Sequence, residues 1–123
     1  MNAGARTYKT VARQIASPRE MEADLLLGAA SRLQTIRDCW DGNKQHLGAA
    51  LLHNRKLWTI FLTDVTGGSS PLPVEIRQNV ANLGVFVINH TLAIAREPHP
   101  DQLDVLININ RQIAAGLRGM PAT

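Results

Sequence analysis

Apolar side chains recur at intervals of three and four residues along most of the chain, a pattern typical of helices that bury one face. Proline and glycine divide this pattern into segments, which predict helices over about 5–15, 18–40, 44–65, 74–95 and 100–117. No clean alternation of apolar and polar residues predicts a strand, and the β-prone residues 85–88 continue a helical pattern. The pattern therefore predicts an all-α fold, an up-down bundle of about four long helices with a short N-terminal helix.

Within each predicted helix, the apolar positions define the side expected to face the core. These positions are Tyr8, Val11, Ala12 and Ile15 in the first helix; Met21, Leu25, Leu26, Ala29, Leu33, Ile36 and Trp40 in the second; Leu47, Leu51, Leu57, Trp58, Phe61 and Leu62 in the third; Ile76, Val80, Leu83, Val87, Ile88, Thr91 and Leu92 in the fourth; and Leu103, Leu106, Ile107, Ile113, Ala114 and Leu117 in the last. Aromatic residues make up only 4% of the chain, so aliphatic side chains are expected to dominate this core.

Several short motifs indicate where the helices begin and end. Ser17 can cap the second helix, Pro18 suits its first position and Glu20 can complete a capping box. Residues 41–43, Asp-Gly-Asn, are expected to end that helix. Residues 66–71 predict the longest linker, after which Pro73 opens the fourth helix.

The chain has 123 residues, of which 45% are apolar and 19% are charged, so a single folded domain over 1–123 is expected. Its ends are expected to be a short basic helix over 1–16 and a flexible tail over 118–123. The only cysteine, Cys39, cannot form an internal disulfide, which favours a reducing compartment. Neither a signal peptide nor a stretch long enough to span a membrane is evident. A cytoplasmic protein without membrane insertion is therefore expected.

The net charge of +3 is distributed unevenly. Arg6, Lys9, Arg13 and Arg19 all precede the first acidic residue, Glu20. This excess is interpreted as the solvated face of the leading helix. The alternative is electrostatic contact of Arg6, Lys9 and Arg13 with an acidic partner or with RNA.

Residues that could support catalysis or metal binding do not form a recognisable group. His46 and His53 share a helix face but lie about 10 Å apart by helical rise, too far for one metal ion. Cys39 lies near a predicted helix C-terminus, where a buried or half-buried structural thiol is expected. Gly67 and Gly68 are not followed by the lysine of a phosphate-binding loop. No catalytic residue, metal or cofactor is predicted, and an enzyme is not expected.

Polar residues inside the apolar helices are the least ordinary feature of the sequence, because asparagine is a poor helix former. The asparagines concerned are Asn54, Asn79, Asn82, Asn89, Asn108 and Asn110. One interpretation is that several are buried and hydrogen-bonded across the bundle. The other is a groove in which amides and arginines orient a bound amphipathic helix. Trp58 with Arg55 suits such an interface, although a tryptophan at helical spacing is more often part of the core.

Three stretches resemble the signature segments of the FlaF family of flagellar biosynthesis proteins: residues 54–61 (NRKLWTIF), 72–84 (LPVEIRQNVANLG) and 103–117 (LDVLININRQIAAGL). Tyr8 and residues 16–20 (ASPRE) add to this resemblance, which covers the chain from about Tyr8 to Leu117. It implies a bacterial, chiefly alphaproteobacterial, regulator of flagellar filament production. Members are thought to be flagellin chaperones that act alongside, and often against, FlbT, which restrains flagellin synthesis through the flagellin messenger RNA. No catalytic residue is implied.

The resemblance and the helical pattern together predict an adaptor that covers an amphipathic terminal segment of flagellin before export. Its partner-binding residues are predicted to be Arg55, Trp58, Arg77, Asn79 and Asn82. One alternative is a post-transcriptional regulator that contacts flagellin messenger RNA directly. The scarcity of aromatic platforms for bases argues against it. Another alternative is a module whose main partner is FlbT.

Overall fold

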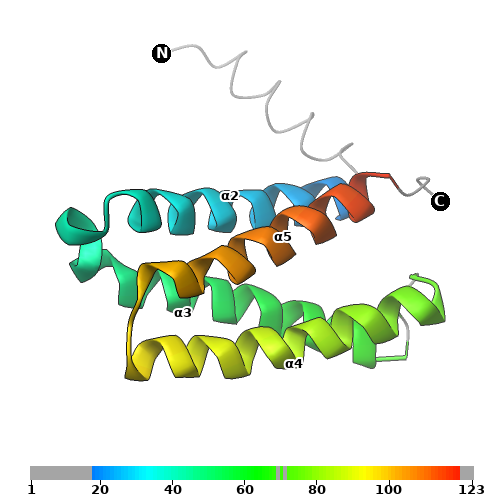
Figure 1. Cartoon of the computed structure of the whole chain (residues 1–123). Helices are drawn as coiled ribbons and strands as arrows, with labels where there is room; N and C mark the ends of the chain where they lie inside the picture. The colour runs from blue at the N-terminus through cyan, green and yellow to red at the C-terminus, as the bar shows by residue number, and fades with distance from the viewer. Residues whose placement is uncertain (1–17, 69, 71, 120–123) are drawn as a thin grey trace, which may run out of the picture.

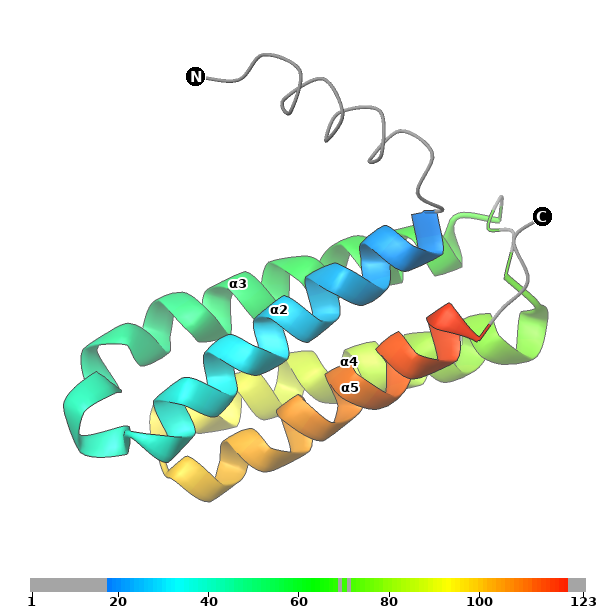
Figure 2. The same ribbon diagram turned by 90° about the horizontal axis from the view of Figure 1, so that it is seen from above.

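The computed structural model describes residues 18–68, 70 and 72–119. In chain order these residues form α2 (Pro18–Asp38), α3 (Trp40–Thr66), α4 (Val74–Arg96), a 3-10 helix η1 (Pro100–Gln102) and α5 (Leu103–Arg118). The long helices share one general axis, and consecutive helices run in opposite directions (Figure 1 and Figure 2). The predicted all-α bundle is therefore confirmed for these residues. The predicted helix over 5–15, the Ser17 cap and the last residues of the predicted tail lie outside them.

The helices do not pack with equal closeness. α2 contacts both α3 and α5 extensively, whereas α4 packs chiefly against α3 and makes few contacts with α5. In Figure 1, α2 and α5 lie side by side, and α4 lies on the far side of the bundle from α2. α4 is thus a peripheral helix, held mainly by one neighbour.

Local sequence explains most helix ends. Pro18 is the first residue of α2, as predicted, and Glu20 in the first turn and Arg37 in the last complement the helix dipole. Before η1, the backbone N–H of His99 donates to the side-chain oxygen of Gln102 at 2.9 Å. α5 continues to Arg118, whose guanidinium binds the carboxylate of Asp24 on α2.

The break between α2 and α3 falls at Cys39, earlier than predicted. The Cys39 carbonyl accepts hydrogen bonds from the backbone N–H of Gly42 and from the side-chain amide of Asn43, each at 3.1 Å. Residues 41–43 therefore start α3 and do not end α2, and Asp41 lies where the α3 dipole favours an acid. The thiol of Cys39 is exposed. The expectation of a buried or half-buried thiol was wrong, because this residue lies at the corner between two helices.

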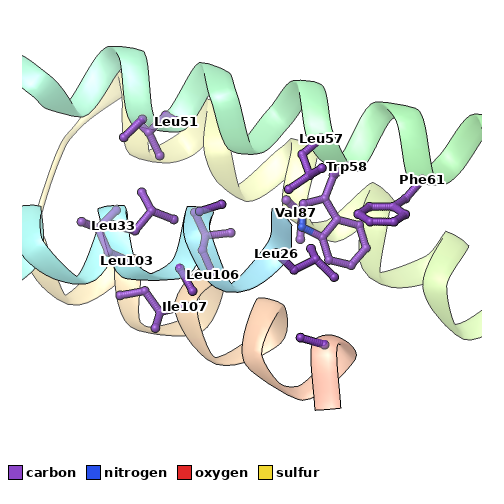
Figure 3. Close-up of a cluster of buried hydrophobic side chains, with 14 of the residues drawn as sticks. Leu26, Leu33, Leu51, Leu57, Trp58, Phe61, Val87, Leu103, Leu106 and Ile107 are labelled. Atoms are coloured by element: carbon purple, nitrogen blue, oxygen red, sulfur yellow. The ribbon is translucent and has the colours of Figure 1, made fainter. Parts of the chain in front are cut away.

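The core lies between α2, α3 and α5, with one side of α4 closing it. Leu26, Leu33, Trp58, Val87 and Leu106 are among its fully enclosed side chains, and Figure 3 shows them converging from all four helices. Phe61 packs edge-on against Trp58, with ring centroids 5.9 Å apart. Most residues predicted to face inward do so, and aliphatic side chains dominate as expected.

Three residues that the pattern assigned to the core are exposed: Met21, Leu25 and Leu92. Each lies at the edge of an apolar stripe that is wider than the face its helix buries. In α4 the buried side runs through Val80, Gly84, Val87, Thr91 and Ile94. Most of the positions predicted to face inward from α4 are buried or half-buried. The prediction for α4 was wrong at Leu92, which is exposed, while Ile88 is half-buried at the edge of the buried side.

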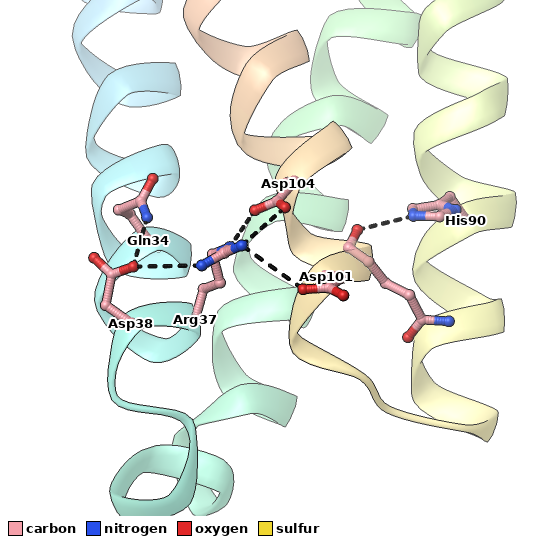
Figure 4. Close-up of polar contacts among 7 residues, drawn as sticks. Gln34, Arg37, Asp38, His90, Asp101 and Asp104 are labelled. Atoms are coloured by element: carbon pink, nitrogen blue, oxygen red, sulfur yellow. Dashed lines mark hydrogen bonds and ion pairs between the residues drawn. The ribbon is translucent and has the colours of Figure 1, made fainter.

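Polar contacts join the helices at the end of the bundle where α4 leads into α5 (Figure 4). The guanidinium of Arg37 on α2 binds both carboxylate oxygens of Asp104 on α5 and lies 3.7 Å from Asp101. The hydrogen bond to Asp104 raises the pKa of Arg37, which keeps its charge. On α4, His90 Nε2–H donates to the Gln102 carbonyl at 2.9 Å. Since the ion pair is partly exposed, it orients α5 on α2 more than it stabilises the fold.

Candidate functional site: an outer face of helices α3 and α4

A buried polar network occupies the centre of the bundle. Trp58 Nε1–H donates to Asn110 Oδ1 at 2.8 Å, and Asn110 Nδ2 donates to Asn54 Oδ1 at 2.7 Å. Asn110 Nδ2 also reaches the Leu26 carbonyl at 3.3 Å, so the network links α2, α3 and α5. All three side chains are completely buried.

This network shows the role of two of the six helix-interior asparagines. Asn54 and Asn110 are hydrogen-bonded across the bundle, as the first interpretation proposed. The placement of Trp58 on a binding surface was wrong, because its exposure is 0% and its only polar atom is bound inside the core. Asn79, Asn82, Asn89 and Asn108 are exposed.

The contact between Gly84 and Leu62 sets the register of α4 on α3. A Cβ placed on Gly84 would lie 2.7 Å from both Cγ and Cδ2 of Leu62. The Leu62 side chain therefore occupies the space that a larger residue at position 84 would need. Glycine is required here because α3 and α4 approach closely, not because of its backbone conformation. Positions on the two antiparallel helices can be compared by counting residues from this contact.

Counting from that contact places two exposed leucines on one face. Leu52 lies ten residues before Leu62, and Leu92 lies eight after Gly84, so both are about 12–15 Å along the bundle in the same direction. Successive residues are rotated by about 100° around the helix axis, so each leucine is rotated by about 80° from the contact residue of its own helix, in the same sense. Because α3 and α4 are antiparallel, the same sense of rotation leads to the same side. Leu52 and Leu92 therefore lie together on the outside of the helix pair.

The apolar side chains of this face continue along α4. Val85 and the half-buried Ile88 carry the stripe from Leu92 toward the middle of the helix, and Val74 repeats it at the start. Val85 is 56% exposed and Val74 is 65% exposed, and Arg77 and Gln78 interrupt the apolar row between Val74 and Ala81. We call this surface the outer α3–α4 face and define it as Leu52, Arg55, Val74, Arg77, Val85, Ile88 and Leu92. A row of exposed apolar side chains is typical of a surface that binds another helix.

Two of the predicted site residues, Arg55 and Arg77, belong to the outer α3–α4 face. Each lies seven residues before the Leu62–Gly84 contact on its own helix, so they lie near opposite ends of the apolar row, about 20 Å apart. Arg55 is exposed, whereas Arg77 is half-buried. Arg77 Nε is enclosed and has no hydrogen-bond partner among the described residues.

The remaining predicted residues do not join this group. Asn79 and Asn82 are exposed on α4 but are rotated away from the outer α3–α4 face, so they do not lie beside Arg55. Arg6, Lys9 and Arg13 lie outside the described residues. Sequence reasoning missed Leu52 and Val85, and it assigned Ile88 and Leu92 to the core. The signal was present, because positions 74, 81, 85, 88 and 92 are all apolar at helical spacing.

Comparison with known proteins identifies the family. The family model for the flagellar protein FlaF matches residues 4–117, which is nearly the whole chain. The chain belongs to the FlaF family. The resemblance seen in the three signature stretches is thereby confirmed, and the protein is related to the flagellum. No curated protein and no solved structure matches it. The matched residues of this FlaF-family chain include all of the outer α3–α4 face.

Other kinds of site find less support in the residues that the structure describes. No group of three or more His, Cys, Asp or Glu side chains there could hold a metal ion. A hollow of about 280 Å³ is lined by Trp40, Lys44, Leu47 and Pro98, which include no carboxylate, hydroxyl, thiol or imidazole. None of the described helices combines the length and apolarity that crossing a membrane requires.

A second, smaller apolar patch lies where α2 begins and α3 ends. The carboxylates of Glu22 on α2 and Asp64 on α3 are close enough to interact. Met21 and Leu25 lie beside Glu22 on α2, and Ile60 lies one turn before Asp64 on α3. The pair of carboxylates therefore brings these three apolar residues near one another. All three apolar side chains are about half exposed, and Ile60 reaches 59%. We call Met21, Leu25, Ile60, Glu22 and Asp64 the α2–α3 patch. Burial, and then the charge of Asp64, raise the pKa of Glu22 above its ordinary value of 4.5.

Replacing Glu22 by glutamine is expected to stabilise the protein at about pH 7 but not at about pH 3. The raised pKa means that folding favours the protonated carboxyl. Its contribution to stability is complete below pH 4.5 and is lost as the pH rises through the folded-state pKa. Glutamine is uncharged at both pH values and avoids that loss. Urea unfolding of Glu22→Gln at both pH values measures the difference. The control is Glu75→Gln, in the exposed first turn of α4, which should show no gain in the free energy of unfolding at pH 7. An equal effect of Glu22→Gln at both pH values would contradict the prediction.

Proposed function

We propose that this FlaF-family protein is a non-enzymatic adaptor that binds flagellin in the cytoplasm before export and promotes its synthesis and secretion. The outer α3–α4 face is the observation that supports this proposal. Its apolar side chains extend over about 30 Å, with an interruption at Arg77, and this length matches one side of an amphipathic helix of about 20 residues. The terminal segments of flagellin are amphipathic and assemble prematurely when left free. Covering one of them is the function that this surface suits best.

The charges of the outer α3–α4 face specify the partner further. Arg55 and Arg77 lie near its two ends, and Arg96 lies beyond Leu92 at the end of α4. A bound helix would therefore carry acidic residues beside its apolar stripe. The apolar row would supply most of the binding free energy, and the arginines would select the orientation.

The decisive experiment is calorimetric titration of the protein with monomeric flagellin. The variant Val85→Asp/Leu92→Asp is expected to bind at least about 100-fold more weakly, because two charges would be buried against the apolar stripe of the partner. Both side chains are exposed in the free protein, so the variant should remain folded, which circular dichroism would check. Leu25→Asp, a similarly exposed leucine on α2 and outside the outer α3–α4 face, is the matched control and should bind normally.

Each other result points to a different conclusion. Wild-type protein that does not bind flagellin would overturn the proposed function, and a stoichiometric complex with FlbT would then make FlbT the main partner. Affinity for flagellin messenger RNA that falls steeply with salt would favour direct regulation of the message. Normal binding by Val85→Asp/Leu92→Asp would retain the function but exclude the outer α3–α4 face as its site.

A further inference from the structure

The α2–α3 patch has a chemistry that differs from that of the outer α3–α4 face. Its apolar residues Met21, Leu25 and Ile60 surround two carboxylates, whereas the outer α3–α4 face carries arginines. The patch begins at the first turn of α2, the point at which residues 1–17 enter the described part of the chain. An occupant that complements the patch must be apolar on one side and basic elsewhere.

We propose that residues 5–15 of the same chain pack against the α2–α3 patch as an amphipathic helix. Tyr8, Val11, Ala12 and Ile15 are spaced to form one apolar side of such a helix. Residues 1–17 contain three basic residues and no acidic one, which complements Glu22 and Asp64. A helix of eleven residues is about 16 Å long, enough to cover the turns of α2 from Met21 to Leu25.

The covalent connection makes even a weak contact effective. Because residue 17 is joined directly to Pro18, the segment is held near the patch at an effective concentration on the order of millimolar. Burial of Ile60 and Leu25 against Ile15 and Val11 would then provide the driving force. The repulsion by Asp64 contributes to the raised pKa of Glu22, and Arg19 opposes it. A basic residue of the segment would add to the effect of Arg19.

Hydrogen exchange of the full chain without any partner tests this proposal. A free helix of eleven residues is marginal in water, so amides 8–15 are expected to exchange at least about tenfold more slowly than in an unfolded peptide only if the segment is docked. In Ile60→Lys this protection should be lost, because the apolar contact is replaced by a like charge. Val85→Lys, an equally exposed position on the outer α3–α4 face, should retain it.

A second measurement uses cysteine pairs in a Cys39→Ser background. Val11→Cys with Ile60→Cys should form an intramolecular disulfide under mild oxidation, and Val11→Cys with Leu52→Cys should not. Unprotected amides in the wild type, or protection unchanged by Ile60→Lys, would overturn the proposal. Protection that increases with protein concentration would also overturn it, since a second copy would then cover the patch. None of these measurements involves flagellin, so their outcome is independent of the proposed function.

Discussion

Replacing Asn110 by alanine is expected to lower the free energy of unfolding by about 3–5 kcal/mol. Its side chain accepts the Trp58 indole N–H and donates to both Asn54 and the Leu26 carbonyl. Alanine would leave the Trp58 donor and the Asn54 acceptor buried without partners, and it would also leave a small cavity. The loss is a large part of the stability of an ordinary domain of this size. Urea unfolding followed by circular dichroism measures it.

The matched control is Asn108→Ala on the same helix. Asn108 is exposed and accepts only a surface hydrogen bond from Gln112, so its replacement should change stability by less than about 0.5 kcal/mol. A loss of less than about 1 kcal/mol in Asn110→Ala would show that the hydrogen bonds of the network contribute little net stability. The network would then specify the alignment of α2, α3 and α5 without stabilising it.

The second large effect is expected at the contact between α4 and α3. Gly84→Leu should lower the free energy of unfolding by about 2–3 kcal/mol, because the new side chain occupies the space of Leu62. Leucine is a better helix former than glycine, so the loss would come from packing and not from helix propensity. Thermal or urea unfolding of the variant measures the change.

A compensating substitution separates packing from other causes. Leu62→Ala removes the obstructing side chain, so the double variant Gly84→Leu/Leu62→Ala should regain at least about 1 kcal/mol relative to the sum of the single effects. Strictly additive losses would mean that Leu62 does not set the distance between the helices. Because α4 is held mainly by α3, Gly84→Leu should also distort the outer α3–α4 face and weaken partner binding.

The buried polar network and the outer α3–α4 face have different roles in this molecule. Asn54, Trp58 and Asn110 are hydrogen-bonded to one another inside the core, so they align α2, α3 and α5 and cannot meet a partner. Asn54 Nδ2 has no hydrogen-bond partner among the described residues. Leu52, Val85 and Leu92 remain exposed because they lie on the sides of α3 and α4 that face away from the core. The proposed adaptor function therefore depends on which side of α4 contacts α3.

Helix ends could be predicted wherever a local interaction determines them. Pro18 begins α2 because proline lacks the N–H that a first helical position leaves unbonded anyway. The break at Cys39 was misplaced because Asp41, Gly42 and Asn43 favour the end of one helix and the start of the next about equally. Which of the two occurs depends on the direction of the Cys39 carbonyl, and that direction follows from how α3 folds back on α2.

By itself the sequence determined the helical class, the approximate helix boundaries, most of the aliphatic core and membership of the FlaF family. The first three follow from spacing and local chemistry, which act over a few residues, whereas the family follows from the resemblance of three stretches of sequence. Only the tertiary structure decided that Trp58 belongs to the core and that Ile88 and Leu92 border an exposed face. The stripes of α4 are both apolar enough to be buried, and hydropathy does not distinguish them. The close approach at Gly84 does, because it brings one side of α4 against Leu62 and leaves the side of Val85 and Leu92 on the surface.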